Sequence, residues 1–350
     1  MSFPSPVDSA VTPRSRKVLR GVLAALVGLV ALALILFTLR YRAFRSDVAR
    51  ADQQWNAARP VRLSDMGSTR ELSILPLLDW HKSRDDLATN AGVSYLVKTD
   101  QHTILFDLGN NSEDTDPSPL EHNLKALGVD IAKVDTIVVS HAHFDHVGGR
   151  RFTHGELSGT TFGIGHSQSD LSGKRVLVPV AMTYPGVVPE LATQAMRIGP
   201  GVATTGTIAR RLFGGWTDEQ ALAVNVADKG IVLIVGCGHQ TLERLLARSD
   251  ALFDTPLFGV VGGLHLPVPA GRITIGFFDA QRRFASGDGP FAPLDESDVD
   301  RHFDLLEARH LGLLSIGGHD SSDQVIEKAR ARFASAYRSL RVGEEIRVGP

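Results

Sequence analysis

The sequence predicts an α/β domain, in which helices cover the sheets, preceded by one membrane-spanning helix. Apolar runs with the character of strands come first in pairs and later alternate with helical segments, which is typical of α/β proteins. An uncharged apolar run near the N-terminus predicts the membrane-spanning helix. With 350 residues, the chain is long enough for one large domain or two modest ones.

The membrane-spanning prediction rests on residues 21–39, which carry no charge and match the roughly 20 residues that cross a hydrocarbon core. A cleavable signal peptide is the alternative, although its apolar stretch is shorter, about 7–15 residues. Basic residues flank the run equally, with Arg14, Arg16, Lys17 and Arg20 before it and Arg40, Arg42, Arg45 and Arg50 after it. We expect a single-pass protein of the cell membrane, embedded in the lipid bilayer through residues 21–39. The favoured side for the folded domain is extracytoplasmic, because a short basic tail is retained inside.

Four parts are expected along the chain. These are a basic tail at 1–18, the transmembrane anchor at 19–40, a polar stalk at 41–70 and the folded domain at 71–350. An insertion near 267–296 interrupts this domain and is long enough to be a functional lid or a mobile segment. The net charge of −2, without a stripe of Lys and Arg, argues against nucleic acid as a partner. A single cysteine, Cys237, excludes an intrachain disulfide framework.

Periodicity and turn residues predict the individual elements of the domain. Helices are expected at 119–127, 241–249, 298–309 and 322–340. Strands are expected at 72–78, 93–99, 102–109, 134–141, 174–180, 221–226, 230–239, 257–265 and 311–319.

The most informative motif, SHAHFDHVGG, directly follows the strand expected at 134–141. It places four metal-binding side chains, His141, His143, Asp145 and His146, within six residues. Such a loop can direct two side chains to one ion and two to a neighbouring ion, about 3.5–4 Å away. A solvated histidine-rich turn is the alternative, but this loop leaves a buried strand. The motif therefore predicts a metal centre.

Three further histidines each follow an apolar strand that ends in glycine: His239, His265 and His319. We expect them to converge with the 141–146 loop at one edge of the sheets, where they can complete the metal coordination. Cys237, two residues before His239, is expected within reach of the centre; the alternative is a buried small hydrophobe. The histidines without this setting, His81, His102, His302 and His310, are interpreted as structural, and His122 and His166 stay unassigned.

At these residues the chain resembles the metallo-β-lactamase superfamily, whose hallmark is the pattern HxHxDH. Within it, the chain looks most like the branch related to dihydropterin–ribofuranosylaminobenzene phosphate synthase. The resemblance implies an αββα sandwich with the metals at one rim, and implies His141, His143, Asp145 and His146 as ligands. The similar segments are 104–111, 121–130, 200–210, 218–240, 260–266 and 317–322.

This chain departs from the pattern of that branch at three places. It has Cys237-Gly238-His239 for Cys-Ser-His, Gly206-Thr207-Ile208 for Gly-Glu-Ile, and His319-Asp320-Ser321-Ser322 for His-Cys-Thr-Gly. The fold and the metal site survive these changes, whereas the substrate does not follow from the resemblance.

The leading functional hypothesis is a membrane-anchored hydrolase that acts on a small-molecule ester, lactone, amide or phosphoester. Two divalent metal ions, zinc or else manganese or iron, would activate a water molecule. Asp145 would orient that water while ligating, and His265 would stabilise the developing oxyanion or hold a phosphate. The alternatives are a pterin-condensing type of transferase with a diphosphate leaving group, and a non-catalytic membrane-tethered binding module. The predicted ligands are His141, His143, Asp145, His146, His239 and His319.

Overall fold

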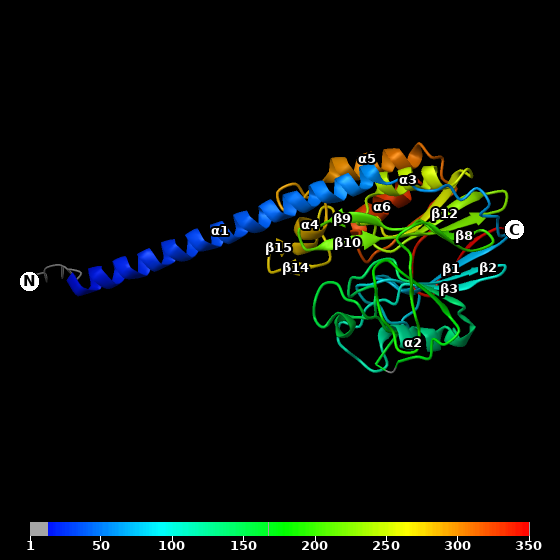
Figure 1. Ribbon diagram of the computed structural model, residues 1–350, viewed down its shortest axis with the longest axis horizontal. Coiled ribbons are helices and arrows are strands. Elements are labelled where there is room, and N and C mark those ends of the chain that lie inside the picture. The colour runs from blue at the N-terminus through cyan, green and yellow to red at the C-terminus, as the bar shows by residue number, and fades with distance from the viewer. Residues whose placement is uncertain (1–12, 167, 350) are drawn as a thin grey trace, which may run out of the picture. The chain divides into compact units, whose positions relative to one another are not determined.

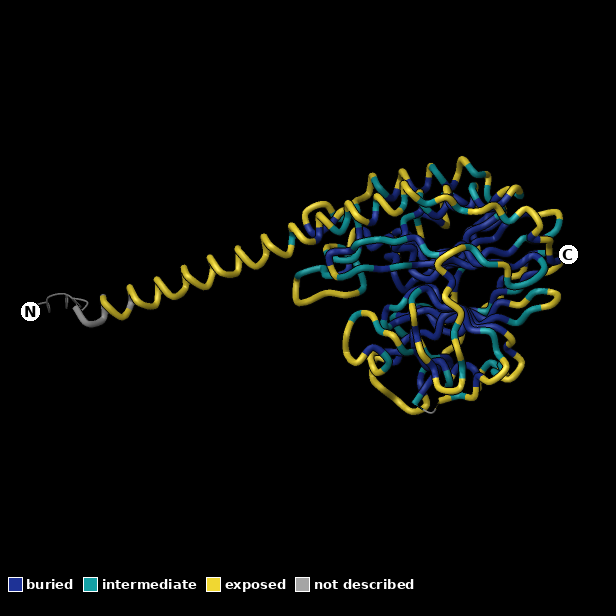
Figure 2. Tube along the Cα trace, in the orientation of Figure 1, coloured by how far each residue is buried: buried dark blue, intermediate teal, exposed yellow. Residues whose placement is uncertain are grey.

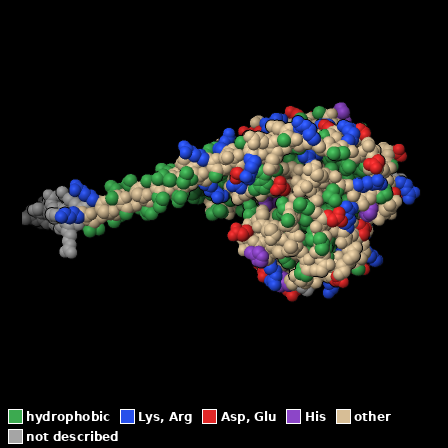
Figure 3. Space-filling model, in the orientation of Figure 1, with side chains coloured by type: hydrophobic (Ala, Val, Ile, Leu, Met, Phe, Trp, Pro, Cys, Tyr) green, Lys and Arg blue, Asp and Glu red, His purple; other side chains and the backbone are tan. Residues whose placement is uncertain are grey.

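The computed structural model describes residues 13–166 and 168–349, and the chain divides after Arg50 into two compact units. Residues 1–12, most of the predicted basic tail, lie outside the described residues. Helix α1 (Pro13–Ala57) carries the apolar run, whose side chains are exposed from Val22 to Leu39 (Figures 2 and 3). By length and composition this helix is a candidate membrane span, with a mean hydropathy of 2.9 in its most apolar window, and a signal sequence would pass the same test.

The second unit begins at Ala51, earlier than the domain boundary expected at residue 71. Met66 is buried in the core, and the Leu63 amide donates a hydrogen bond to the Leu252 carbonyl. Part of the segment expected to be a stalk is therefore integrated into the folded unit.

Two β-sheets form the centre of this unit (Figure 1). The first sheet has the order β17 (Ile346–Val348), β1 (Leu72–Leu78), β2 (Ser94–Thr99), β3 (Thr103–Phe106), β4 (Thr136–Val138), β5 (Arg175–Val178) and β6 (Glu190–Leu191). The second has the order β16 (Leu313–Ile316), β13 (Leu257–Gly262), β12 (Gly230–Val235), β11 (Leu222–Val226), β8 (Val202–Thr204) and β7 (Met196–Gly199). Two hairpins, β9 (Ile208–Arg211) with β10 (Trp216–Glu219) and β14 (Thr274–Ile275) with β15 (Phe278–Asp279), stand apart from them.

The buried apolar residues show that the sheets face each other. One cluster joins Ile74 and Ile104 of the first sheet to Val232 and Val261 of the second. A second cluster packs α3 (Leu242–Leu252), α5 (Glu296–Glu307) and α6 (Asp323–Arg332) on the outer side of the second sheet. A third packs α2 (Pro119–Ala126) on the first sheet. This is the αββα sandwich that the resemblance implied.

Sequence patterns explain the elements that position the site. Every residue of β12 is buried, as expected for a parallel strand covered on both faces. This strand pairs in parallel with β13, and β13 pairs in parallel with β16. Helix α2 starts with a capping box in which Ser118 and Glu121 satisfy each other's backbone amides. Short 3₁₀ turns at Ile131–Lys133 and Arg150–Thr153 flank β4 and the loop that follows it.

Some predicted boundaries were wrong. The helix expected at 322–340 ends at Arg332, because the chain turns there to bury Phe333 and Tyr337, and Tyr337 forms a β-bridge with Leu314. The strand expected at 134–141 is only Thr136–Val138, since the chain leaves the sheet to form the histidine loop. Strands β6 to β10 and β17, which are two to four residues long, were not predicted.

Candidate metal centre

The loop after β4 bends sharply enough to gather its metal-binding side chains. The His146 amide donates to the His143 carbonyl, closing a tight turn. Gly148 has φ of 99°, and a Cβ added to it would meet the Gly163 carbonyl oxygen at 2.0 Å. Only glycine fits there, which explains the Gly-Gly pair that follows the motif. All four side chains, His141, His143, Asp145 and His146, are buried.

The three histidines predicted to complete the site lie where neighbouring strands end. His239, His265 and His319 follow β12, β13 and β16, which are adjacent and parallel, so their carboxyl ends share one edge of the sheet. The ring centroids of His239 and His141 are 5.1 Å apart, and those of His319 and His146 are 5.2 Å apart. The structure therefore brings all the predicted site residues together.

The six predicted ligands divide into two groups of three that share no member. His141, His143 and His239 form the first triad, and Asp145, His146 and His319 form the second triad. In each triad the donor atoms lie within 4.8 Å of one another. The spacing of the motif predicts this pairing within the loop, His141 with His143 and Asp145 with His146, and does not assign His239 and His319 to either pair.

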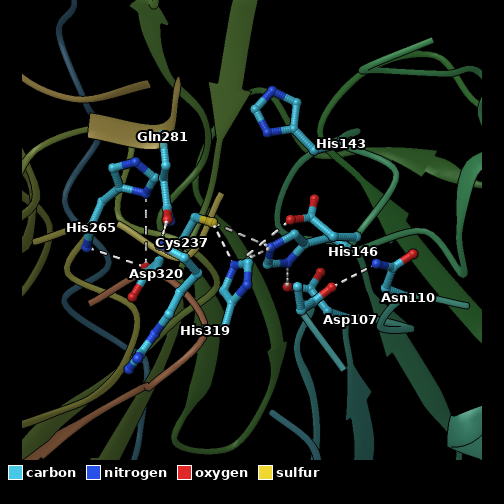
Figure 4. A network of polar contacts seen from close by, with 12 residues as sticks. Asp107, Asn110, His143, His146, Cys237, His265, Gln281, His319 and Asp320 are labelled. Carbon is cyan, nitrogen blue, oxygen red and sulfur yellow. Dashed lines mark hydrogen bonds and ion pairs between the residues drawn. The ribbon is translucent and has the colours of Figure 1, made fainter. Parts of the chain in front are cut away.

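Hydrogen bonds at the back of the rings leave one nitrogen of each loop histidine facing inward. His141 Nδ1 contacts the Ser140 hydroxyl at 2.9 Å, and His143 Nε2 contacts the Thr217 hydroxyl at 3.1 Å. The remaining nitrogens, His141 Nε2 and His143 Nδ1, are 3.1 Å apart. In the second triad, His146 Nε2 and His319 Nε2 are 3.3 Å apart (Figure 4). Two nitrogens bound to one tetrahedral zinc lie about 3.3 Å apart, so these pairs have the spacing of ligands.

Buried polar atoms without a partner also fit a metal. Among the described residues, both ring nitrogens of His239, Nδ1 of His319 and Oδ1 of Asp145 are buried and make no hydrogen bond. Leaving such atoms unsatisfied costs about 1–3 kcal/mol each, and a coordinated cation removes that cost for the atoms that ligate it. Both ring nitrogens of His265 are also buried and make no hydrogen bond among the described residues.

Four buried carboxylates hold the turns that carry these histidines. Glu219 accepts the amides of Cys237, Gly238 and His239 at 2.7–3.0 Å. Asp79 accepts the amides of Gly318 and His319. Asp320 accepts the amide of His265. Asp107 accepts the Ser140 amide and contacts His146 Nδ1.

Sequence reasoning missed these carboxylates. Asp79 and Asp107 directly follow apolar strands, and Glu219 is the last residue of β10. An acidic residue at the end of a strand was therefore the sequence feature that could have indicated these carboxylates. Asp107 also has a left-handed backbone, with φ of 59°.

The electrostatic environment favours neutral imidazoles in the first triad. Burial, followed by the charges of neighbouring histidines, lowers the pKa of His141 and His239 well below the usual range, and burial lowers that of His143 to about 3. His146 differs. Burial would lower its pKa, but the Asp107 carboxylate at 2.7 Å raises it to about 9. Without a metal, His146 therefore carries a proton that a cation must displace.

Cys237 lies between the two triads. Its sulfur is 3.0 Å from His319 Nε2 and 3.4 Å from His146 Nε2, and Figure 4 shows the three side chains pointing toward one another. Cys237 also forms candidate metal-binding groups with His141 and His146 and with His239 and His265. The cysteine is thus within reach of donor atoms of both triads.

Three of the histidines interpreted as structural contact carboxylates outside the two triads, although His302 also lines the pocket that contains His239 and His265. His81 contacts Asp323, His102 contacts Asp135, and His302 contacts Glu243. The unassigned pair has similar partners, His122 with the Asp86 carbonyl and His166 with Asp114.

A cavity of about 720 Å³ opens beside the centre, with His239 and His265 in its wall. Its far wall comes from residues 282–295, which belong to the predicted insertion. A volume of this size suits a small-molecule ligand.

Comparison with known proteins agrees with this geometry. A model of the metallo-β-lactamase superfamily matches residues 88–151, which include the whole HxHxDH motif. The chain is 23% identical to 7,8-dihydropterin-6-methyl-4-(β-D-ribofuranosyl)-aminobenzene-5'-phosphate synthase of Methanocaldococcus jannaschii, over 58% of this chain and 81% of that protein.

Similarity to a solved structure supports the fold. A metal-dependent hydrolase of the β-lactamase superfamily superposes with a TM-score of 0.52 at 18% identity, covering 80% of this chain and 100% of the other. The metallo-β-lactamase fold protein YhfI from Bacillus subtilis gives a TM-score of 0.47 at 12% identity, with the same coverage. The chain therefore has the metallo-β-lactamase fold, and its HxHxDH loop lies within the segment that matches the superfamily model.

Proposed function

We propose that this protein is a metal-dependent hydrolase, anchored in a membrane, that uses two divalent ions, zinc first, to cleave a small-molecule ester, lactone, amide or phosphoester. The single observation that carries the proposal is the pair of complete, separate triads beside a cavity of about 720 Å³. Two ions at such a centre supply Lewis-acid activation of a water molecule and of the scissile group.

The chain's own residues have distinct roles in this proposal. Asp145 offers Oδ1, a buried oxygen without a partner among the described residues, to accept a hydrogen bond from the attacking water and orient it. His265 lines the cavity, and neither of its ring nitrogens makes a hydrogen bond among the residues described; Nδ1 lies 4.0 Å from Asp320 Oδ2. In the proposal it donates to the developing oxyanion or to a phosphate oxygen. Asp320 accepts the His265 amide at 3.2 Å and holds a backbone with φ of 50°.

The membrane anchor is part of the same proposal. The apolar run at 21–39 is retained in the mature protein, because it is longer than the apolar stretch of a signal peptide and is followed directly by the basic segment RYRAFR instead of a cleavage site. N-terminal sequencing of the purified protein checks this, and an N-terminus beyond Leu39 would contradict it. Protease treatment of spheroplasts then gives the side of the domain, which digests if it is extracytoplasmic.

The test of catalysis is metal analysis of the full chain followed by a broad screen of esters and phosphoesters. Two ions per chain and turnover with release of water-derived product support the hydrolase. Product that retains an added amine instead of water identifies a transferase, as the similarity to the methanogen synthase suggests. Full metal loading without turnover of any tested substrate would support the alternative of a non-catalytic binding module.

A further inference from the structure

We propose that Arg282 and Arg283, in the insertion at 267–296, bind an anionic oxyacid group of the substrate, such as a phosphate or carboxylate, while its scissile bond lies at the histidine cluster. The inference rests on the proposed function, which it extends to a substrate class. The observation that carries the inference is that one cavity is lined both by His239 and His265 and by these arginines.

Most other charged side chains of the cavity wall pair with a charged group, whereas Asp295 accepts backbone amides and keeps a charge that acts on Arg282. Arg210 pairs with Asp288 at 3.1 Å, and Arg301 pairs with Asp298 at 2.7 Å. Two further carboxylates line the cavity and are also occupied. Glu243 pairs with His302 at 3.1 Å, and Asp295 caps α5 by accepting the amides of Ser297 and Asp298.

Arg282 and Arg283 donate to backbone carbonyls instead. Arg282 Nε and Nη1 donate to the carbonyls of Leu294 and Pro269, and Arg283 Nη1 donates to that of Pro290. Carbonyls fix the direction of a guanidinium group without cancelling its charge. Among the described residues, Nη2 of Arg282 and both Nε and Nη2 of Arg283 have no acceptor, so the wall presents two oriented cations with free donors.

The position of the pair favours substrate recognition over folding. Both residues lie on the short helix α4 (Ala280–Ala285), which the Asp279 side chain caps by accepting the Arg282 amide at 2.8 Å. Planar guanidinium groups bind phosphate and carboxylate oxygens through paired hydrogen bonds. Leu212 and Leu264 line the same cavity, so the ligand combines an anionic group with an apolar body.

The experiment uses the full chain in detergent, with its metal content measured first, and three probes that share one ring: phenyl phosphate, benzoate and benzamide. Calorimetry gives the dissociation constant of each for the wild type, for Arg282→Gln/Arg283→Gln and for Arg301→Gln. Arg301 is the matched control, because it lines the same cavity but is paired with Asp298.

We expect the double variant to keep its metal ions and to bind phenyl phosphate, benzoate or both at least about tenfold more weakly, since charge-assisted hydrogen bonds are lost. The Arg301 variant should stay within about twofold of the wild type. If only one of the two anions binds the double variant more weakly, that anion identifies the substrate group that the arginines bind. Neutral benzamide should bind equally weakly to all three proteins.

Unchanged anion affinity in the double variant would overturn the inference, because the anion would then be bound by the metal ions alone. An equal loss of anion affinity in the Arg301 variant would overturn the inference too, because the overall positive charge of the cavity, and not Arg282 and Arg283 in particular, would then attract the anion. Binding is measured without turnover, so a wild type that binds anions through this pair but hydrolyses nothing refutes the hydrolase and leaves the anion site standing.

Discussion

The two triads share one buried centre but differ in their surroundings. The first, His141, His143 and His239, is built from imidazoles alone, and hydroxyl groups of Ser140 and Thr217 support two of its rings. The second contains a carboxylate, Asp145, and a histidine, His146, that is paired with the buried Asp107.

The two triads are therefore not equivalent as candidate metal sites. Neutral nitrogen donors suit zinc, whereas a site with carboxylate oxygen also accepts harder ions such as manganese. The Asp107 pairing stabilises a proton on His146, so the second triad competes with protons where the first does not. Each prediction below tests whether the triads behave as separate and unequal sites.

The largest effect is expected from removing one ligand of each triad. His239→Ala should lose the ion of the first triad and His319→Ala that of the second, so each variant binds one ion per chain while the wild type binds two. Mass spectrometry of the native proteins measures the stoichiometry. If both variants retain two ions with unchanged affinity, the centre is built from other residues.

The next largest effect is expected from the carboxylates that hold the turns. Glu219→Gln should weaken the ion of the first triad about 10- to 100-fold, since three amides of the His239 turn lose a charged acceptor. Asp79→Asn should do the same to the second triad through the His319 turn. Competition with a chromophoric chelator measures both affinities, with circular dichroism as the control for folding. Equal weakening of both ions in each variant would contradict separate sites.

The pH dependence should separate the triads further. Because the pKa of His146 is raised to about 9, its proton must leave before metal binds, so the affinity of the second triad should fall about tenfold per unit as pH drops below that value. The lowered pKa values of His141 and His239 leave the first triad nearly independent of pH over the same range. Zinc titrations between about pH 6 and pH 8 check this. Parallel slopes for the two ions would refute it.

The smallest effect concerns Cys237, which lies within reach of both triads. We expect alkylation of this cysteine to be several-fold slower in metal-loaded than in metal-stripped protein, because a bound ion would occupy the thiol. Mass spectrometry of the labelled peptide follows the rate. Equal rates would assign Cys237 to the core as a buried small side chain.

The sequence by itself determined the features that are local along the chain. The HxHxDH loop is recognised from a buried strand before it and glycines after it. The three other histidines are recognised in the same way, because each follows an apolar strand that ends in glycine. Parallel strands end at a common edge, so convergence of His239, His265 and His319 followed from the pattern. The apolar run at 21–39 likewise predicts its helix from composition alone.

Only the tertiary structure decided how these residues are shared and supported. The division into two triads depends on which strand end faces which side of the loop, and no spacing along the chain encodes that. Asp107 and Glu219 were missed because their hydrogen-bond partners lie 18 to 39 residues away, at turns brought together by the sheets. The short strands between residues 190 and 219 carry too few alternating residues for periodicity to show. The proposed role of the insertion also depends on the fold, because Arg282 and Arg283 are far from His239 and His265 in the sequence and line the same cavity only in the folded chain.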